Sequence, residues 1–284
     1  MFSKFPEFPE FLLKKKLEEY FEEDLLLGDV TEVVRTEIRA NIVSGAKGIV
    51  AGINVARTAL EMFGIEIVYA IEDGSQVEPK DVVMQIEGNS TDIMMAERTV
   101  LNILMKMSGI ATTTSQMVER SRKHDPSIMV AATRKNTPGF RLLEKMAVST
   151  GGGATHRLSM GDCVLVKSTL VKIAGGVEQA MEIARKADFT KKIEVEVDNT
   201  ADLLTAVDER ADIIMLDNMP PEEVKQAIKT LNEKGLRDKI IVEASGGINM
   251  DNVEDYASTG VDVISSSFPT LSSPPLDLRL EIID

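Results

Sequence analysis

The chain has 284 residues, a formal net charge of −14 and 43% hydrophobic residues. This length suggests one large or two modest domains, with ample apolar material for packed cores. The acidic balance argues against a nucleic-acid-binding protein, which needs a basic surface, but it leaves room for a local basic pocket. A single cysteine, Cys163, excludes an internal disulfide framework, and we expect it in an apolar strand of the core.

The N-terminal residues predict no targeting to a membrane. They contain acids and prolines before any apolar run, which is unlike a signal peptide. No stretch of the chain approaches the roughly 20 apolar residues of a membrane span. We therefore expect a cytoplasmic protein with neither a membrane nor a nucleic acid as its partner.

The first third of the chain predicts a mixed α+β region without strict alternation of strands and helices. Apolar periodicity predicts a long helix from about residue 91 to 123, with a break at Ser108-Gly109. The earlier elements are helices over residues 11–23 and 55–63 and strands over 38–43, 48–51, 65–70 and 82–86.

From residue 128 onward, six apolar runs alternate with helical patterns. Such alternation predicts parallel βα units, two short of a closed eight-stranded barrel. The tail over residues 276–283 alternates apolar and polar residues, and we expect it to return to the first domain as a strand. The six runs begin at Ile128, Cys163, Ile193, Ile213, Ile240 and Val261.

Each of these runs ends in polar residues. Because the carboxyl ends of parallel strands meet at one edge of a sheet, we expect their side chains to share one cavity. The cations among them suit a multiply anionic ligand, since guanidinium and ammonium groups bind carboxylate and phosphate. Solvated loops with ordinary cations are the alternative interpretation. The cationic candidates, with one neighbouring hydroxyl, are Thr133, Arg134, Lys135, His156, Arg157 and Lys167.

Carboxylates and small residues follow the other runs. Glu194 and Glu196 share one face of a strand, which faces either a barrel interior or, on a bland edge strand, water. With Asp217 they suit either Mg²⁺ ligands for a polyphosphate or stabilisers of a developing cation. Two neighbouring loops predict a phosphate cradle made of backbone N–H groups. These loops contain Ser245, Gly246 and Gly247 in one and Ser265, Ser266 and Ser267 in the other.

In this order, the motifs resemble those of the quinolinate phosphoribosyltransferases, and the match covers nearly the whole chain. The matching strings are Gly28-Asp29-Val30-Thr31, Ala96 to Asn102, Ser108 to Thr112, Thr133-Arg134-Lys135 with Pro138-Gly139, Gly151-Gly152-Gly153 with His156-Arg157-Leu158, Lys167, Glu194 to Val197, Leu216-Asp217-Asn218 and Glu243 to Ile248.

The resemblance implies an α/β protein with an N-terminal α+β domain and an open (β/α) barrel of six to seven units. We expect the first domain over residues 1–111, joined by the tail 270–284, and the barrel over residues 112–269. The implied reaction joins quinolinate and phosphoribosyl pyrophosphate, with Mg²⁺, to give nicotinate mononucleotide, CO₂ and pyrophosphate. The implied assembly is a homodimer or hexamer.

The resemblance also implies roles for residues. Arg98 matches an arginine that the neighbouring subunit donates. The dicarboxylate pocket matches Arg134, Lys135, His156, Arg157 and Lys167. Glu196 and Asp217 match carboxylates near the ribose and its metal, and Ser245-Gly246-Gly247 matches the 5-phosphate cradle. Of these, Lys135, Lys167, Glu196 and Asp217 are the expected catalytic residues, and Thr133, Ser265 and Ser267 complete the expected binding set.

The sequence departs from the family pattern at four places. Ser168-Thr169-Leu170 stands where the family has Asp-Asn-His, and Ser267 stands where it has glycine. Asn136 and Thr155 replace a threonine and an asparagine. These departures leave two alternatives open. One is a paralogue for another acidic base, either nicotinate-like or related to the molybdenum-transport-associated members of the fold. The other is a ligand sensor without turnover.

Overall fold

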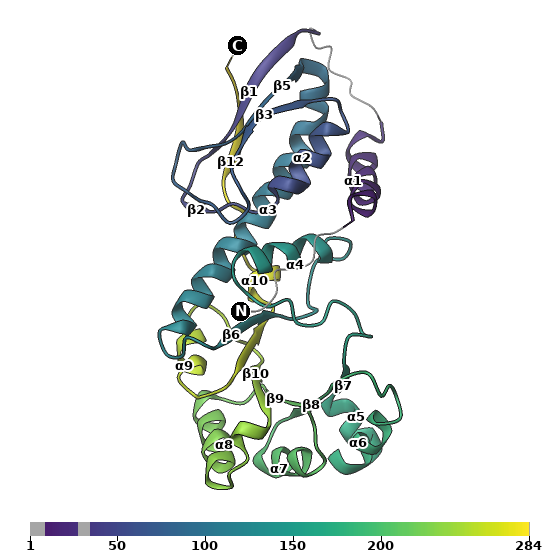
Figure 1. The fold of residues 1–284 in the computed structure, drawn as a ribbon, viewed down its shortest axis with the longest axis vertical. Coiled ribbons are helices and arrows are strands. Elements are labelled where there is room, and N and C mark those ends of the chain that lie inside the picture. Colours follow the sequence, from purple (N-terminus) through teal and green to yellow (C-terminus); the bar gives the residue numbers. More distant parts are fainter. Residues whose placement is uncertain (1–8, 28–34, 284) are drawn as a thin grey trace. The chain divides into compact units, whose positions relative to one another are not determined.

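The computed structural model describes residues 9–27 and 35–283, which form two compact units (Figure 1). Unit 1 comprises Met1–Ser115, Leu142–Gly152 and Ser273–Asp284, as far as these are described. Unit 2 comprises Gln116–Arg141 and Gly153–Ser272. The motif Gly28-Asp29-Val30-Thr31 lies outside the described residues.

Unit 1 is built on a four-stranded antiparallel sheet in the order β12-β1-β5-β3. The C-terminal strand pairs with β1, with Ile42 opposite Leu280, so the tail is a structural part of this unit. Helix α1 packs on the unit through Phe21, whose ring lies 4.7 Å from that of Phe63. The strands are β1 (Glu37–Ser44), β2 (Gly48–Ile49), β3 (Glu66–Ala70), β4 (Gln76–Val77), β5 (Val82–Asn89) and β12 (Leu278–Ile282). The helices are α1 (Glu10–Leu25), α2 (Ile53–Glu61), α3 (Ser90–Arg122) and α4 (Arg141–Thr150).

The long helix α3 is continuous, so the predicted break at Ser108-Gly109 is wrong. A Cβ on Gly109 would lie 2.1 Å from the carbonyl oxygen of Pro274, so the glycine allows close approach of the returning tail. The Ser108 hydroxyl accepts a hydrogen bond from the Ala51 N–H at 3.0 Å. Both residues therefore serve packing against the helix, and neither ends it.

Unit 2 is an open, six-stranded parallel sheet in the order β6-β11-β10-β9-β8-β7. This confirms the predicted α/β class and the six strands. A single parallel bridge between Ala131 and Ala154 continues the sheet beyond β6. The strands are β6 (Met129–Ala132), β7 (Val164–Val166), β8 (Ile193–Val197), β9 (Ile213–Asp217), β10 (Ile241–Ser245) and β11 (Val263–Ser266). The helices are α5 (Ser168–Ala174), α6 (Val177–Ala184), α7 (Thr200–Asp208), α8 (Pro221–Glu233), η1 (Arg237–Lys239), α9 (Val253–Ala257) and α10 (Phe268–Leu271).

The two faces of this sheet differ in chemistry. One face packs with the helices in a single apolar core, to which Val195, Ile214 and Val242 belong. Because side chains alternate along a strand, Glu194, Glu243 and their polar neighbours lie on the opposite face, the inside of the open barrel. The fold thus directs polar groups inward while its apolar face provides stability.

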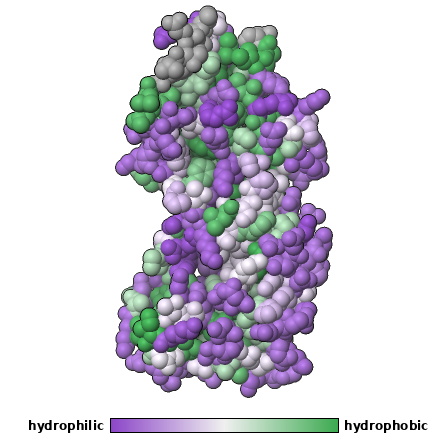
Figure 2. All heavy atoms as spheres, turned by 180° about the vertical axis from the view of Figure 1, so that it is seen from behind, coloured by the Kyte–Doolittle hydropathy of each residue, from purple (hydrophilic) through white to green (hydrophobic). Residues whose placement is uncertain are grey.

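The surface carries many hydrophilic residues. In the view of Figure 2, most exposed atoms are hydrophilic, and apolar atoms gather only in small groups. Within the part of the chain that the structure describes, none of the helices combines the length and the apolar character that crossing a bilayer requires.

Candidate active site

A cationic cavity of about 710 Å³ opens in unit 2 beside β7, and three predicted site residues line it. Arg134 follows β6, Arg157 follows the bridge at Ala154, and Lys167 follows β7 as the N-cap of α5. Each therefore stands at the carboxyl end of a strand or bridge of the parallel sheet. The cavity walls include apolar and polar residues, among them Met160, Cys163, Leu165, Thr169, Leu170 and Ile173.

Two guanidinium groups of this cavity have buried donors without partners. The Nε atoms of Arg134 and Arg157 are buried, and neither has a hydrogen-bond partner in the described residues. Leaving such a donor unpaired costs about 1–3 kcal/mol, and more for a charged group. Both arginines line the cavity together with Lys167, so the positive charge of its walls suits a carboxylate ligand.

A second cavity of about 210 Å³ lies at the ends of β10 and β11. Gly246, at φ +105°, is needed because a Cβ there would lie 2.3 Å from the Asn218 side-chain oxygen. The fully buried Ser265 hydroxyl has no hydrogen-bond partner in the described residues. Backbone N–H groups and hydroxyls in a glycine turn form a cradle for phosphate. The predicted residues that line this cavity are Thr133, Lys135, Ser245, Gly246, Gly247, Ser265 and Ser267.

Glu196 and Asp217 occupy the ends of neighbouring strands, β8 and β9. The Ser168 N–H donates to Glu196 Oε2 at 3.2 Å, and Asn218 Nδ2 donates to Asp217 Oδ2 at 2.9 Å. Burial raises the pKa of Glu196, and the negative charge of Asp217 raises it further. The hydrogen bond from Ser168 and the positive charges of Lys167 and Arg157 lower this pKa and offset part of the rise. Two mutually repelling carboxylates at one edge form a donor set that suits a divalent cation together with phosphate oxygens.

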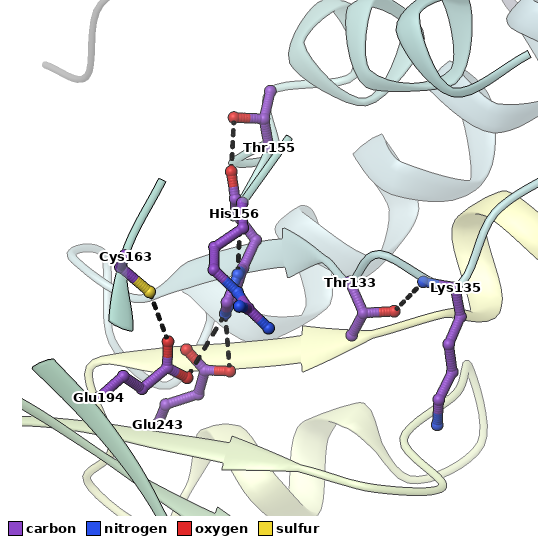
Figure 3. Close-up of polar contacts among 8 residues, drawn as sticks. Thr133, Lys135, Thr155, His156, Cys163, Glu194 and Glu243 are labelled. Carbon is purple, nitrogen blue, oxygen red and sulfur yellow. Dashed lines mark hydrogen bonds and ion pairs between the residues drawn. The ribbon is translucent and has the colours of Figure 1, made fainter. Parts of the chain in front are cut away.

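His156 lies in a buried cluster with Glu194, Glu243 and Cys163, which we call the carboxylate–histidine cluster (Figure 3). Its Nε2 is 3.2 Å from Glu243 Oε1 and 3.7 Å from Glu194 Oε1. Burial raises the pKa of Glu194, and the negative Glu243 adds to this. The resemblance grouped His156 with the cations of the base pocket, whereas the structure places its ring against two carboxylates.

The sequence analysis did not include Cys163 and Glu243 among the site residues. Cys163, expected in the apolar core, is only half-buried, and its Sγ lies 3.5 Å from Glu194 Oε2. Glu243 interrupts an apolar strand run, which is the same signal that singled out Glu194 and Glu196. Arg98 belongs to unit 1, where it is exposed on α3 and lies 3.8 Å from the Glu97 carboxylate.

The Cys163 thiol should be slow to react although it lines an open cavity. Burial, with Glu194 next in weight, raises the pKa of Cys163 to about 12. At pH 8.5 its thiolate fraction is then about 10³-fold below that of a free cysteine with a pKa of about 8.5. We expect iodoacetamide to alkylate the native protein correspondingly more slowly than the urea-unfolded chain, with a rate that still rises above pH 10. Equal rates in the two states would contradict this cause.

Comparison with known proteins identifies the family. The family model "Quinolinate phosphoribosyl transferase, C-terminal domain" matches residues 110–281, and the corresponding N-terminal domain model matches residues 27–108. A probable nicotinate-nucleotide pyrophosphorylase [carboxylating] of Archaeoglobus fulgidus is 46% identical over 90% of this chain and 98% of that protein. One from Methanothermobacter thermautotrophicus is 48% identical over 87% of this chain and 89% of that protein.

Solved structures agree with this result. The nicotinate-nucleotide pyrophosphorylase of Francisella tularensis superposes with a TM-score of 0.91 at 31% identity, covering 100% of both chains. The two domain models together span both structural units, and the likeness holds in sequence and in fold. The chain belongs to the quinolinate phosphoribosyl transferase family.

Proposed function

We propose that this protein transfers the phosphoribosyl group of phosphoribosyl pyrophosphate to quinolinate, with decarboxylation, as a cytoplasmic enzyme of NAD biosynthesis. The ring nitrogen bonds to the anomeric carbon as pyrophosphate departs. One ring carboxylate leaves as CO₂, and a proton replaces it on the ring. The names of the relatives, nicotinate-nucleotide pyrophosphorylase [carboxylating], support this reaction.

The observation that carries the proposal is the convergence of Arg134 and Arg157, with Lys167, on one cavity. A dicarboxylate such as quinolinate supplies two groups that these arginines can bind, with Lys167 as a further cation. The second cavity, with its glycine turn and Lys135, suits the 5-phosphate of the ribosyl donor. Two anion sites in one unit fit a reaction between two anionic substrates.

Glu196 and Asp217 fit the ribosyl and metal part of the reaction. They are the carboxylates that would hold Mg²⁺, which, when bound, would neutralise charge on the leaving pyrophosphate. Their own task is electrostatic, since negative charge beside the anomeric carbon stabilises the positive charge that develops there. Lys167 and Arg157 oppose the rise in the pKa of Glu196 and so favour its charged form.

The proposed assembly is a homodimer or hexamer in which Arg98 reaches the site of the neighbouring subunit. Arg98 is exposed on α3 of unit 1, whereas the other proposed site residues belong to unit 2. Within residues 9–27 and 35–283, the ion pair of this guanidinium is with Glu97, at 3.8 Å. A pair at this distance on an exposed surface holds the guanidinium only weakly, so the group is available to an anionic partner.

The reaction is tested by the release of CO₂ and pyrophosphate from quinolinate and phosphoribosyl pyrophosphate, with nicotinate as the control base. We expect Arg134→Ala and Arg157→Ala each to weaken quinolinate binding by about 1.5–3 kcal/mol, the value of a hydrogen bond to a charged group. Lys186→Ala, in the exposed turn after α6, is the matched control. Parent-like quinolinate binding by both arginine variants would reject the substrate. Donor binding without any product would indicate a sensor.

Glu196→Gln should lower kcat more than it raises KM for quinolinate. The lost charge acts mainly in the transition state, so the decrease in kcat should be on the order of 10²-fold. Steady-state kinetics measures both constants, and Glu182→Gln, which removes an exposed carboxylate of α6, is the control. An effect on KM alone would show that Glu196 serves ground-state binding instead.

Arg98→Ala and Lys167→Ala should each be inactive, and mixing the two proteins should restore part of the activity. A mixed dimer has one site with both mutations and one site with neither, so about half of the mixed dimers' sites are intact. Recovery is measured after subunit exchange has been demonstrated by mass spectrometry of labelled subunits. Exchange without recovered activity would place Arg98 in its own subunit's site or outside any site.

A further inference from the structure

The imidazole of His156 makes two hydrogen bonds that together fix its tautomer. The Arg157 backbone N–H donates to Nδ1 at 2.8 Å, so Nδ1 presents a lone pair and carries no proton. The ring proton is then on Nε2, which lies 3.2 Å from Glu243 Oε1 and donates to it. The chain of contacts runs from the Glu243 carboxylate, through the ring, to the main chain of Arg157.

The surroundings of the ring are polar, and its side chain is 12% exposed. Glu194 and Glu243 have 1% and 3% of their surfaces exposed. Glu194 Oε2 accepts from the Cys163 thiol, and its Oε1, 3.7 Å from His156 Nε2, has no hydrogen-bond partner in the described residues. Figure 3 shows both carboxylates directed at the imidazole, Glu194 from β8 and Glu243 from β10, two strands that β9 separates. The two carboxylates thus offer acceptors on the Nε2 side of the ring.

The main-chain conformation at His156 explains why the hydrogen bonds of its ring are needed. Its φ of +50° lies in the left-handed region, which is uncommon for residues other than glycine, although Asn, Asp and His adopt it more often than the rest. On the N-terminal side, two backbone hydrogen bonds join Ala154 to β6. The Ala132 N–H donates to the Ala154 carbonyl oxygen at 2.9 Å, and the Ala154 N–H donates to the Val130 carbonyl oxygen at 2.8 Å. On the C-terminal side, the His156 ring holds the Arg157 N–H. The strained residue is thus fixed from both directions.

The same three side chains also suggest a metal site, because their ligand atoms lie within 4.8 Å of one another. The tautomer argues against it. A neutral imidazole that binds a metal through Nε2 carries its proton on Nδ1, and that proton would face the donating N–H of Arg157. The hydrogen-bond pattern therefore favours a positioning function over a cation site.

We propose that Glu243 is a positioning residue for Arg157 and acts through the Nε2–H tautomer of His156. Glu243 lines neither the cationic cavity nor the phosphate cradle, whereas Arg157 lines the former. With the ring oriented, Nδ1 holds the loop so that the Arg157 guanidinium stays in the cavity with its buried, unpaired Nε. The kinetic consequence of this inference rests on the proposed function, whereas the tautomer of His156 does not depend on it.

The tautomer is tested by NMR of protein labelled with ¹⁵N-histidine. The chain has only His124 and His156, so two ring systems appear, the exposed His124 serves as an internal reference, and His156→Asn assigns them. We expect an unprotonated Nδ1 and a protonated Nε2 for His156, and mixed tautomers in Glu243→Met. A proton on both nitrogens, a proton on Nδ1 alone, or displacement of the Nε2 proton by added Mg²⁺ or Zn²⁺ would overturn the proposal.

The positioning function is tested by kinetics with quinolinate. Glu243→Met should raise KM about tenfold, equivalent to about 1.4 kcal/mol, and change kcat far less. Glu243→Gln keeps an oxygen that accepts the Nε2 proton and should restore most of the parental KM. Glu223→Met, at the exposed start of α8, is the control, and thermal unfolding checks that every variant is folded.

The possible outcomes separate the two proposals. An unchanged KM in Glu243→Met, or a Glu243→Gln variant as impaired as Glu243→Met, would overturn the positioning function. A parent protein that does not use quinolinate would remove the proposed activity, while the NMR result would still stand or fall by itself.

Discussion

The alternation of side chains along the parallel strands of unit 2 is the constraint on which the rest of the structure depends. Each strand must present apolar residues to the helices, and Val195, Ile214 and Val242 do so within one core. The other face is then free to carry polar groups, provided that they find partners inside the barrel. Since all strands are parallel, their carboxyl ends meet, and the two anion cavities follow from that geometry.

Charge is separated by depth within this barrel. The deepest polar groups, Glu194 and Glu243, are satisfied in part by His156, whereas Arg134, Arg157 and Lys167 surround an open cavity. These three cations give one cavity a local positive lining on a chain with a net charge of −14. A local arrangement therefore decides which ligands enter, and net charge alone is a poor guide to them.

The sequence predicted the strand ends because, in a parallel sheet, a polar residue that directly follows an apolar run lies at the carboxyl end of its strand. It failed where a contact depends on distant segments. Gly109 was interpreted as a helix break, but its function is to admit the tail at Pro274. Arg134 and Lys135 were assigned to one pocket, yet they line different cavities. Arg134 lies in a bend after β6, where the Lys135 N–H donates to the Thr133 hydroxyl, and Thr133 and Lys135 line the other cavity together.

The departures from the family pattern after Lys167 bear on how the base is held. Ser168 keeps one contact whatever its side chain is, because its backbone N–H donates to Glu196. Thr169 and Leu170 line the cationic cavity and make that wall less polar than the Asn-His of the family pattern would. In the proposed reaction, the binding of a dicarboxylate would then depend more on Arg134, Arg157 and Lys167. With fewer alternative partners in the wall, the exact placement of the Arg157 guanidinium matters more, which gives the hydrogen bonds of His156 a direct chemical purpose.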